Sequence, residues 1–197
     1  MNKPYTFVFF GIVGSGKGTQ VKLLGRYLKS NNLSEEVLAT STGSEYRKLI
    51  EKGNYTSQFV KTIIEKGELQ PDFLTISLFT NILISSLKEE TFFIADGFPR
   101  TVVQAEAFEQ AMEFYNRKDI HIIYIELSKE EAIKRMKLRG RSDDTDEGIA
   151  ERFKVYARDV IPSMDYFKNK EGYTMHVING DQTIEAVHEE IIKSLNL

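Results

Sequence analysis

Short apolar runs rich in β-branched and aromatic residues alternate along the chain with longer segments of helical periodicity. This alternation is typical of a parallel sheet whose right-handed crossover helices cover both of its faces. We therefore expect an α/β fold, with a five-stranded parallel sheet flanked by helices, in a single domain over residues 1–197. The five expected strands are Tyr5–Phe10, Glu36–Ala39, Thr91–Ala95, Ile120–Leu127 and Tyr173–Ile178.

The segments between the expected strands are long enough for crossover helices. Pro71 is placed to begin a helix that we expect to run through Ser86. Two polar regions depart from the simple alternation: residues 44–67 predict two helices broken near Gly53, and residues 140–148 predict an exposed loop without apolar periodicity. Both regions are polar enough to lie over a ligand as lids.

A glycine-rich segment follows the first expected strand directly and opens an amphipathic helix. Its glycines allow positive φ angles, and its backbone N–H groups converge at the positive end of the helix dipole. Lys17 adds a mobile ammonium for β and γ phosphates. Gly18 stands where the usual phosphate-loop pattern has a hydroxyl residue. The order of strand, turn and helix predicts a polyphosphate site in the segment Gly11–Thr19.

A second phosphate site is expected where the strand Thr91–Ala95 ends. Asp96 then lies at the carboxyl edge of the sheet, where ligands bind in open α/β folds. Its carboxylate is suited to hold water around a Mg²⁺ ion that bridges nucleotide phosphates. Arg100 offers paired donors to a phosphate, and Thr101 can cap the next helix while Gln104 uses its amide on a base.

Arginines gather around the expected loop at residues 140–148. Arg135 and Arg139 have i, i+4 spacing and share one helix face, Arg141 begins the loop, and Arg152 follows it. Guanidinium groups that converge on one gap repel each other unless anions lie between them, as at a transferring phosphoryl group. Pairing with nearby carboxylates on a solvated surface is the alternative for any single arginine.

The composition and charge of the chain exclude several classes of binding partner. The formal net charge of −3 argues against broad attraction to nucleic acid or anionic membranes, and no apolar run approaches the roughly 20 residues that span a bilayer. With no cysteine and three scattered histidines, we expect no structural zinc. The first residues lack the regions of a secretory signal, so we expect cytoplasmic residence.

Three separated segments resemble the adenylate kinase family, in the family's order: residues 11–20, residues 96–101, and Arg141–Asp144 followed by Arg152. The resemblance covers essentially the whole chain. It implies a P-loop kinase core with a helical monophosphate-binding insert at about 41–70 and a very short lid at about 140–148. It also implies reversible phosphoryl transfer from MgATP to AMP, giving two ADP, and we expect the enzyme to be a monomer that acts on small-molecule nucleotides.

The same resemblance implies roles for individual side chains. Lys17 would follow the transferring group, Arg47 and Arg100 would hold the acceptor phosphate, and Gln104 would read the adenine edge. The arginines around the lid would stack on the ATP base and neutralise the phosphoryl group in transit. The implied sets are Gly14, Ser15, Gly16, Lys17, Gly18, Thr19, Arg135, Arg139 and Gly180 for ATP; Thr42, Gly43, Arg47, Gln70, Gly97, Arg100, Gln104, Arg141 and Arg152 for AMP; Asp96 for the metal through water; and Lys17, Arg100, Arg139, Arg141 and Arg152 for catalysis.

Two departures from the family pattern leave the acceptor open. Ser44 replaces the acidic residue usual after Thr-Gly, and Gln70 stands where a valine usually backs the acceptor base. The alternatives are the same chemistry on UMP, CMP or a deoxynucleotide, or a nucleotide-binding module without catalysis. Retention of the lysine and of the arginines argues against the inactive module, since binding alone would not require them all. Asp143 and Asp144 resemble lid carboxylates that pair with arginines.

Overall fold

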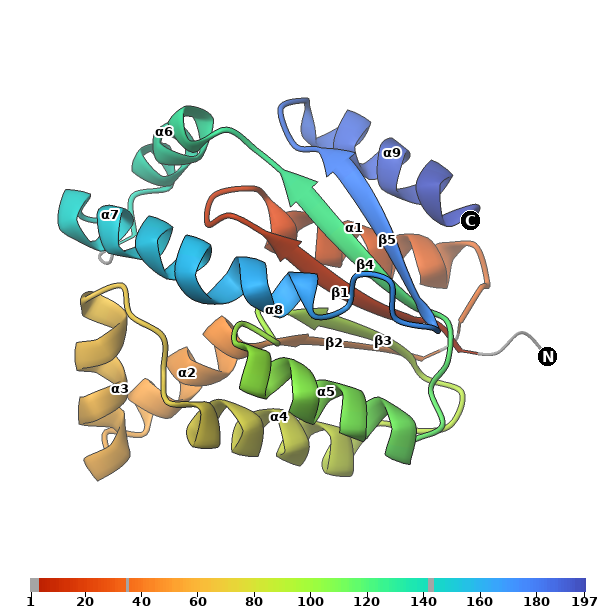
Figure 1. The fold of residues 1–197 in the computed structure, drawn as a ribbon, viewed down its shortest axis with the longest axis horizontal. Helices are drawn as coiled ribbons and strands as arrows, with labels where there is room; N and C mark the ends of the chain where they lie inside the picture. The colour runs from red at the N-terminus through yellow and green to blue at the C-terminus, as the bar shows by residue number, and fades with distance from the viewer. Residues whose placement is uncertain (1–3, 35, 142–143) are drawn as a thin grey trace.

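A five-stranded, all-parallel sheet with strand order β2-β3-β1-β4-β5 forms the centre of the protein (Figure 1). The computed structural model describes residues 4–34, 36–141 and 144–197. Each strand coincides within two residues with an expected run, which confirms the predicted α/β fold. The strands are β1 (Thr6–Gly11), β2 (Val37–Ser41), β3 (Phe92–Asp96), β4 (Ile120–Glu126) and β5 (Tyr173–Asn179).

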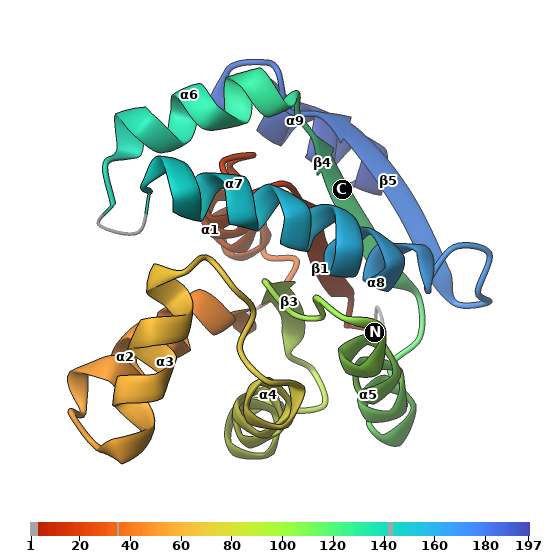
Figure 2. The ribbon, with the colours of Figure 1, turned by 60° about the vertical axis from the view of Figure 1, so that its left-hand side comes forward.

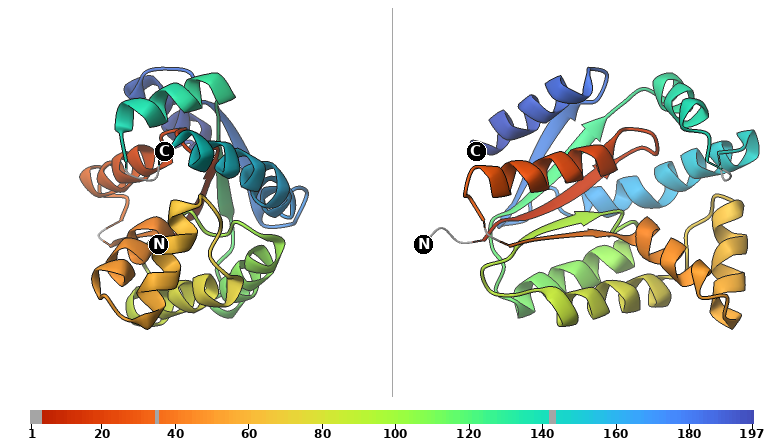
Figure 3. Two further views of the ribbon diagram at one scale, coloured as in Figure 1. Left: turned by 90° about the vertical axis from the view of Figure 1, so that its left-hand side faces the viewer. Right: turned by 180° about the vertical axis from the view of Figure 1, so that it is seen from behind.

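Helices cover both faces of the sheet (Figure 3). Apolar side chains of α1 and α9 pack on one face, and those of α4, α5 and the region of α8 pack on the other. The helices are α1 (Lys17–Ser30), α2 (Thr42–Glu51), α3 (Tyr55–Glu65), α4 (Asp72–Ser86), α5 (Val102–Phe114), α6 (Lys129–Arg139), α7 (Asp146–Val155), the π-helical turn η1 (Tyr156–Val160), α8 (Ile161–Asp165) and α9 (Ile184–Leu195).

Strand β1 lies in the middle of the sheet, and its side chains alternate between the two layers of the core. Phe7 and Phe9 belong to the cluster that includes α1 and α9, whereas Val8 and Phe10 belong to the cluster under α4 and α5. All four side chains are at most 2% exposed. A strand buried on both faces carries an unbroken apolar run, which explains the sequence before the glycine-rich segment.

The carboxyl ends of the strands collect the segments that carry the candidate chemistry. Phe9 of β1 and Ser41 of β2 both pair in register with Asp96 of β3, so the chain leaves all three strands at the same level. The pair α2–α3 lies on one side of this edge and α6–α7 on the other (Figure 2). The topology thus brings together segments that are far apart in the sequence.

The polar region at residues 44–67 forms two helices, as expected. Asn54 begins the second of them: its side chain accepts a hydrogen bond from the Ser57 amide at 3.0 Å, and the Ser57 hydroxyl accepts one from the Asn54 amide at 3.2 Å. These reciprocal bonds satisfy amide donors that the first turn of a helix leaves open.

The exposed loop expected at residues 140–148 is shorter than predicted. Helix α7 already begins at Asp146, because the Thr145 hydroxyl caps it by accepting a hydrogen bond from the Gly148 amide at 3.0 Å. Acidic residues in the first turn add favourable charge at the helix N-terminus. Polarity alone therefore misassigned a capped helix start as loop.

No helix in the described part of the chain has the length and apolar character needed to cross a bilayer.

Candidate functional site

The glycine-rich segment after β1 forms a tight loop that ends at the N-terminus of α1. Gly11, Gly14 and Gly16 have φ angles of 147°, 90° and 91°. At Gly11 a Cβ would lie 2.6 Å from the Ile125 carbonyl oxygen, so this position requires glycine for space as well as for conformation. The loop presents the start of a 14-residue helix, which is a site for anions.

Lys17 bends back over the loop. Its Nζ donates to the carbonyl oxygens of Gly11 at 2.6 Å and Ile12 at 2.9 Å, and to the Ser15 hydroxyl at 3.3 Å. Burial lowers the pKa of Lys17 from 10.5 to about 8; attraction to Asp96 opposes this shift, and repulsion from nearby arginines adds to it. A neighbouring polyanion would favour the charged form.

The turn after β3 holds Arg100 close to the start of α2. Gly97 has a φ of 78°, and its carbonyl oxygen accepts hydrogen bonds from Thr42 Oγ1 at 2.8 Å and from Arg100 Nε at 3.0 Å. A Cβ on Gly97 would lie 2.7 Å from Thr42 Oγ1 and 2.8 Å from Arg100 Nη2. Burial lowers the pKa of Arg100, and attraction to Asp96 opposes that shift. The turn thus fixes a partly buried guanidinium.

Gln104 belongs to a network of fixed hydrogen bonds. Its Oε1 accepts from the Arg100 amide at 2.9 Å, and its Nε2 donates to Asp72 Oδ1 at 2.8 Å. The Thr101 hydroxyl also donates to Asp72 Oδ1, at 2.8 Å, and caps α5 by accepting from the Gln104 amide at 3.1 Å. The side chain of Gln104 therefore has a defined orientation.

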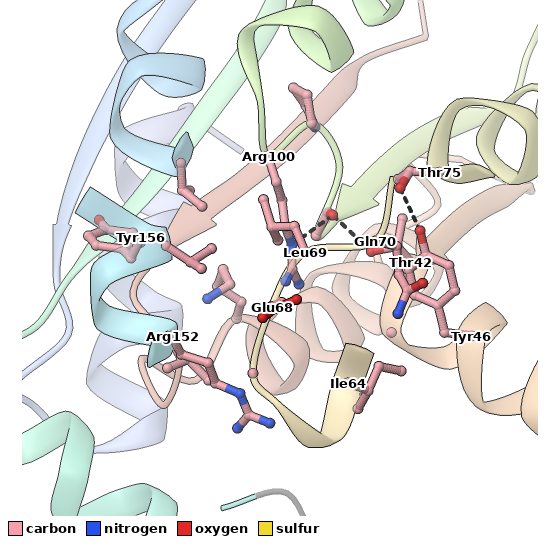
Figure 4. Close-up of a pocket in the computed structure, with 18 of the residues that line it drawn as sticks. Thr42, Tyr46, Ile64, Glu68, Leu69, Gln70, Thr75, Arg100, Arg152 and Tyr156 are labelled. Carbon is pink, nitrogen blue, oxygen red and sulfur yellow. Dashed lines mark hydrogen bonds between the residues drawn. The ribbon is translucent and has the colours of Figure 1, made fainter. Parts of the chain in front are cut away.

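One cavity of about 210 Å³ brings most of the expected residues together (Figure 4). Lys17 and Arg100 line it, and Arg152 and Tyr156 lie across from Gln70, Tyr46 and Thr75, as the close-up shows. The predicted residues that line this cavity are Lys17, Thr42, Gly43, Arg47, Gln70, Gly97, Arg100, Gln104, Arg139, Arg141 and Arg152.

Asp144 links arginines on both sides of the short connection between α6 and α7. Its carboxylate accepts from Arg139 Nε at 3.0 Å and Nη2 at 2.8 Å, and from Arg152 Nη1 at 2.8 Å. The Asp144 side chain is only 1% exposed. Burial raises its pKa, but the hydrogen bonds and charge of the arginines outweigh burial, so the net pKa is lowered and the carboxylate stays ionised. The expected pairing is thus present for Asp144, while Asp143 lies outside the described residues.

A second depression lies on the other side of the glycine-rich loop. Ser15, Gly16 and Thr19 line it together with Arg135 and residues near the start of α9. Arg135 Nε donates to Glu131 Oε1 at 2.9 Å on the same helix. The loop thus lies between two hollows, one lined by Lys17 and the other by Ser15 and Gly16.

Some predicted residues lie outside both hollows. The Gly180 amide donates to the Glu126 carbonyl oxygen at 2.7 Å, and a Cβ there would lie 2.6 Å from that oxygen, so close packing explains this glycine. Gly14 packs on α6, where a Cβ would lie 2.8 Å from the Ala132 carbonyl oxygen. Asp96 ends β3 beside Gly18, with Oδ2 3.6 Å from the position of a Cβ on that glycine.

Among the lining residues of the first cavity that sequence reasoning missed are three with hydroxyl groups, Tyr46, Thr75 and Tyr156. Tyr46 and Thr75 join α2 to α4 through a 2.5 Å hydrogen bond between their hydroxyls, and both are buried. Burial raises the pKa of Tyr46. Tyr156, in the π-helical turn, lines the cavity from the opposite side. Of these three residues, only Tyr46 had a signal in the sequence, because it lies inside the expected monophosphate-binding segment.

A parallel sheet that presents a glycine-rich loop and a cluster of cations at its carboxyl edge is the arrangement of a P-loop nucleotide kinase. The family model described as adenylate kinase matches residues 9–172. The chain is 35% identical to an adenylate kinase of Phocaeicola vulgatus, over 95% of this chain and 96% of that one. It is 32% identical to an adenylate kinase of Dehalococcoides mccartyi, with 97% and 98% covered, and 34% identical to one of Bacteroides fragilis, with 96% and 97% covered.

The chain therefore belongs to the adenylate kinase family. Membership confirms the predicted resemblance and the prediction that the protein is an enzyme that transfers a phosphoryl group from ATP to AMP. The alternative acceptors and the inactive nucleotide-binding module are not favoured.

Proposed function

We propose that the two hollows hold the two nucleotides end to end, with the glycine-rich loop at their junction. The acceptor monophosphate occupies the first cavity, and the base of ATP occupies the second depression. The observation that carries this proposal is the position of the loop: Lys17 faces the first hollow, whereas Ser15 and Gly16 line the second. Phosphates bound along the loop would point at an acceptor, which is the geometry of direct in-line transfer.

Residues of three elements hold the acceptor in this proposal. Arg47 of α2 and Arg100 after β3 bind its phosphate, while Gly43 and Thr42 keep the start of α2 close to that phosphate. Paired guanidinium donors suit a phosphate with two or three anionic oxygens. Gln104 then lies at the base.

The lid arginines neutralise the charge that develops on the phosphoryl group. Arg139 and Arg152 line the first cavity and bind Asp144 in the described structure, and Arg141 lies in the same wall. We assign these three residues, with Lys17, to the transferring group and to its flanking phosphates. No protein nucleophile is required, because positioning and electrostatic stabilisation account for this class of reaction.

Asp96 fits a water-mediated magnesium site. Its carboxylate ends β3 beside Gly18 at the start of α1, and its charge acts on Lys17. Carboxylate oxygen is a ligand type that suits Mg²⁺, which retains several waters. A Mg²⁺ ion brought in with ATP would supply positive charge that offsets the charge of the phosphates. Asp96 would hold the water shell on the protein side.

We assign the insert to residues 41–70 and the lid to residues 140–148 of one kinase domain that spans residues 1–197. Closure of both over the nucleotides would exclude water, which otherwise competes as the acceptor. The proposal extends to a monomeric cytoplasmic enzyme that acts on small nucleotides.

A coupled assay for ADP tests the proposal with AMP, UMP, CMP and dAMP as acceptors. We expect rapid ADP formation with ATP and AMP, and a loss of about 10³-fold in kcat for Lys17→Ala and for Arg141→Ala. Lys22→Ala, at an exposed position on α1, is the matched control and should retain full activity. Slow turnover of AMP beside rapid use of another acceptor would refute the acceptor assignment, and unchanged activity of both variants would refute the catalytic roles.

A further inference from the structure

Gln70 carries a buried acceptor that the protein leaves unpaired. The residue is 6% exposed, and its Nε2 donates to the Val60 carbonyl oxygen at 3.0 Å. Because a carbonyl oxygen only accepts, the amide nitrogen must face Val60, which fixes the position of the amide oxygen. Within the described residues, Oε1 of Gln70 has no hydrogen-bond partner.

The location of this acceptor indicates a ligand. Buried polar atoms are paired in nearly all native structures, so an unpaired acceptor in the wall of a binding cavity points to a donor supplied from outside the protein. Gln70 lines the first cavity, and Figure 4 shows it beside Thr42, Tyr46 and Thr75, away from Arg152. Gln104, which the proposed function places at the acceptor base, lines the same cavity.

Gln104 offers the opposite polarity in the same cavity. Its oxygen is committed to the Arg100 amide, and one hydrogen of its nitrogen is committed to the Asp72 carboxylate. The nitrogen keeps a second hydrogen, so Gln104 can donate to a ligand, although its oxygen also retains a lone pair. A donor on Gln104 and an acceptor on Gln70 complement a base edge that carries a ring-nitrogen acceptor next to an amino group.

Adenine has this edge, because N1 accepts and the 6-amino group donates. Hypoxanthine and guanine have the reverse arrangement, with an N1–H donor beside a 6-oxo acceptor. We propose that Oε1 of Gln70 accepts a hydrogen bond from the 6-amino group of the acceptor nucleotide, which makes Gln70 a specificity-determining residue of this enzyme. The proposal rests on the proposed function, in which AMP occupies this cavity.

The test compares AMP with purine riboside 5′-monophosphate, which lacks only the 6-amino group. We expect the parent protein to prefer AMP in kcat/KM, and Gln70→Met to reduce that preference by roughly 5-fold, the usual value of one neutral hydrogen bond. Gln58→Met, the same substitution at an exposed position of α3, is the matched control.

The possible outcomes distinguish a failure of the proposed function from a failure of the role assigned to Gln70. No ADP from AMP with the parent protein would refute the proposed function. An active parent that uses both nucleotides equally would refute only the role of Gln70, and this measurement requires no variant to fold. Equal losses for both nucleotides in Gln70→Met, with an unchanged ratio, would show that Gln70 supports the backbone at Val60 and does not read the base.

Discussion

Lys17 provides a direct test of the electrostatics of the phosphate loop. The lowered pKa of about 8 places its titration near neutrality in the substrate-free protein. At pH 8 about half of the molecules would carry a neutral Lys17, compared with roughly 0.3% for a lysine with a pKa of 10.5. The cause is burial of the ammonium among the loop carbonyls, together with repulsion from Arg100 and Arg139.

Bound nucleotide should reverse this shift. Phosphate oxygens next to Nζ favour the charged form, so the pKa of Lys17 should rise when ATP binds, and the protein should take up about half a proton at pH 8. The uptake should fall toward zero near pH 6, where Lys17 is already charged in both states.

Trace acetylation across pH 6 to 11, read by peptide mass spectrometry, measures the midpoint of Lys17 directly. We expect a midpoint near 8 without nucleotide and a clearly higher one with a non-hydrolysable ATP analogue. A blocked lysine amide in the same reaction serves as the reference. A midpoint for Lys17 equal to that reference, or one that nucleotide does not move, would contradict the reasoning.

Three further predictions follow from the described contacts. Arg152→Ala should lower kcat by about 10³-fold or more, while the exposed control Lys154→Ala should not; equal kcat in Arg152→Ala and the parent would remove Arg152 from the transition state. Gln104→Ala should reduce the kcat/KM ratio of AMP to UMP by about tenfold, and an unchanged ratio would exclude it from base recognition. Burial, reinforced by His176, lowers the pKa of His121 from 6.5 to about 4, so between these values the unfolded chain binds a proton that the folded protein does not. The free energy of unfolding, measured in urea, should therefore fall by up to about 3 kcal/mol as the pH decreases from 6.5 to 4. His121→Phe should flatten this pH dependence, and an unchanged pH dependence in that variant would refute the role of His121.

The sequence predicted the sheet well because its strands carry strong local signals. β1 and β4 are apolar runs that end at glycine-rich or polar turns, and such runs have few alternatives in an α/β chain. The short β2 was found within two residues, although its run of apolar residues is the weakest of the five. The start of α7 was missed because its cap depends on Thr145, which looks like any other polar loop residue.

The candidate site was predicted only in part, for reasons of tertiary structure. The glycines and arginines have a recognisable spacing, and the cavity gathers most of them. The Asp72 carboxylate that orients Gln104 was not foreseen, because the bond joins the start of α4 to the start of α5 across 32 residues. The hydroxyl pair of Tyr46 and Thr75 was invisible for the same reason. Contacts between distant elements leave no periodic trace in one sequence.

Asp144 supplies an anion from the protein itself to Arg139 and Arg152. That carboxylate accepts from two nitrogens of Arg139 and one of Arg152, so it offsets part of the positive charge that a phosphate would meet there. A free inorganic phosphate would have no other contact to hold it at these arginines. A nucleotide bound along the loop would present its phosphates to them at high effective concentration. The charge that Asp144 offsets should thus weaken the binding of small oxyanions more than the binding of a tethered nucleotide.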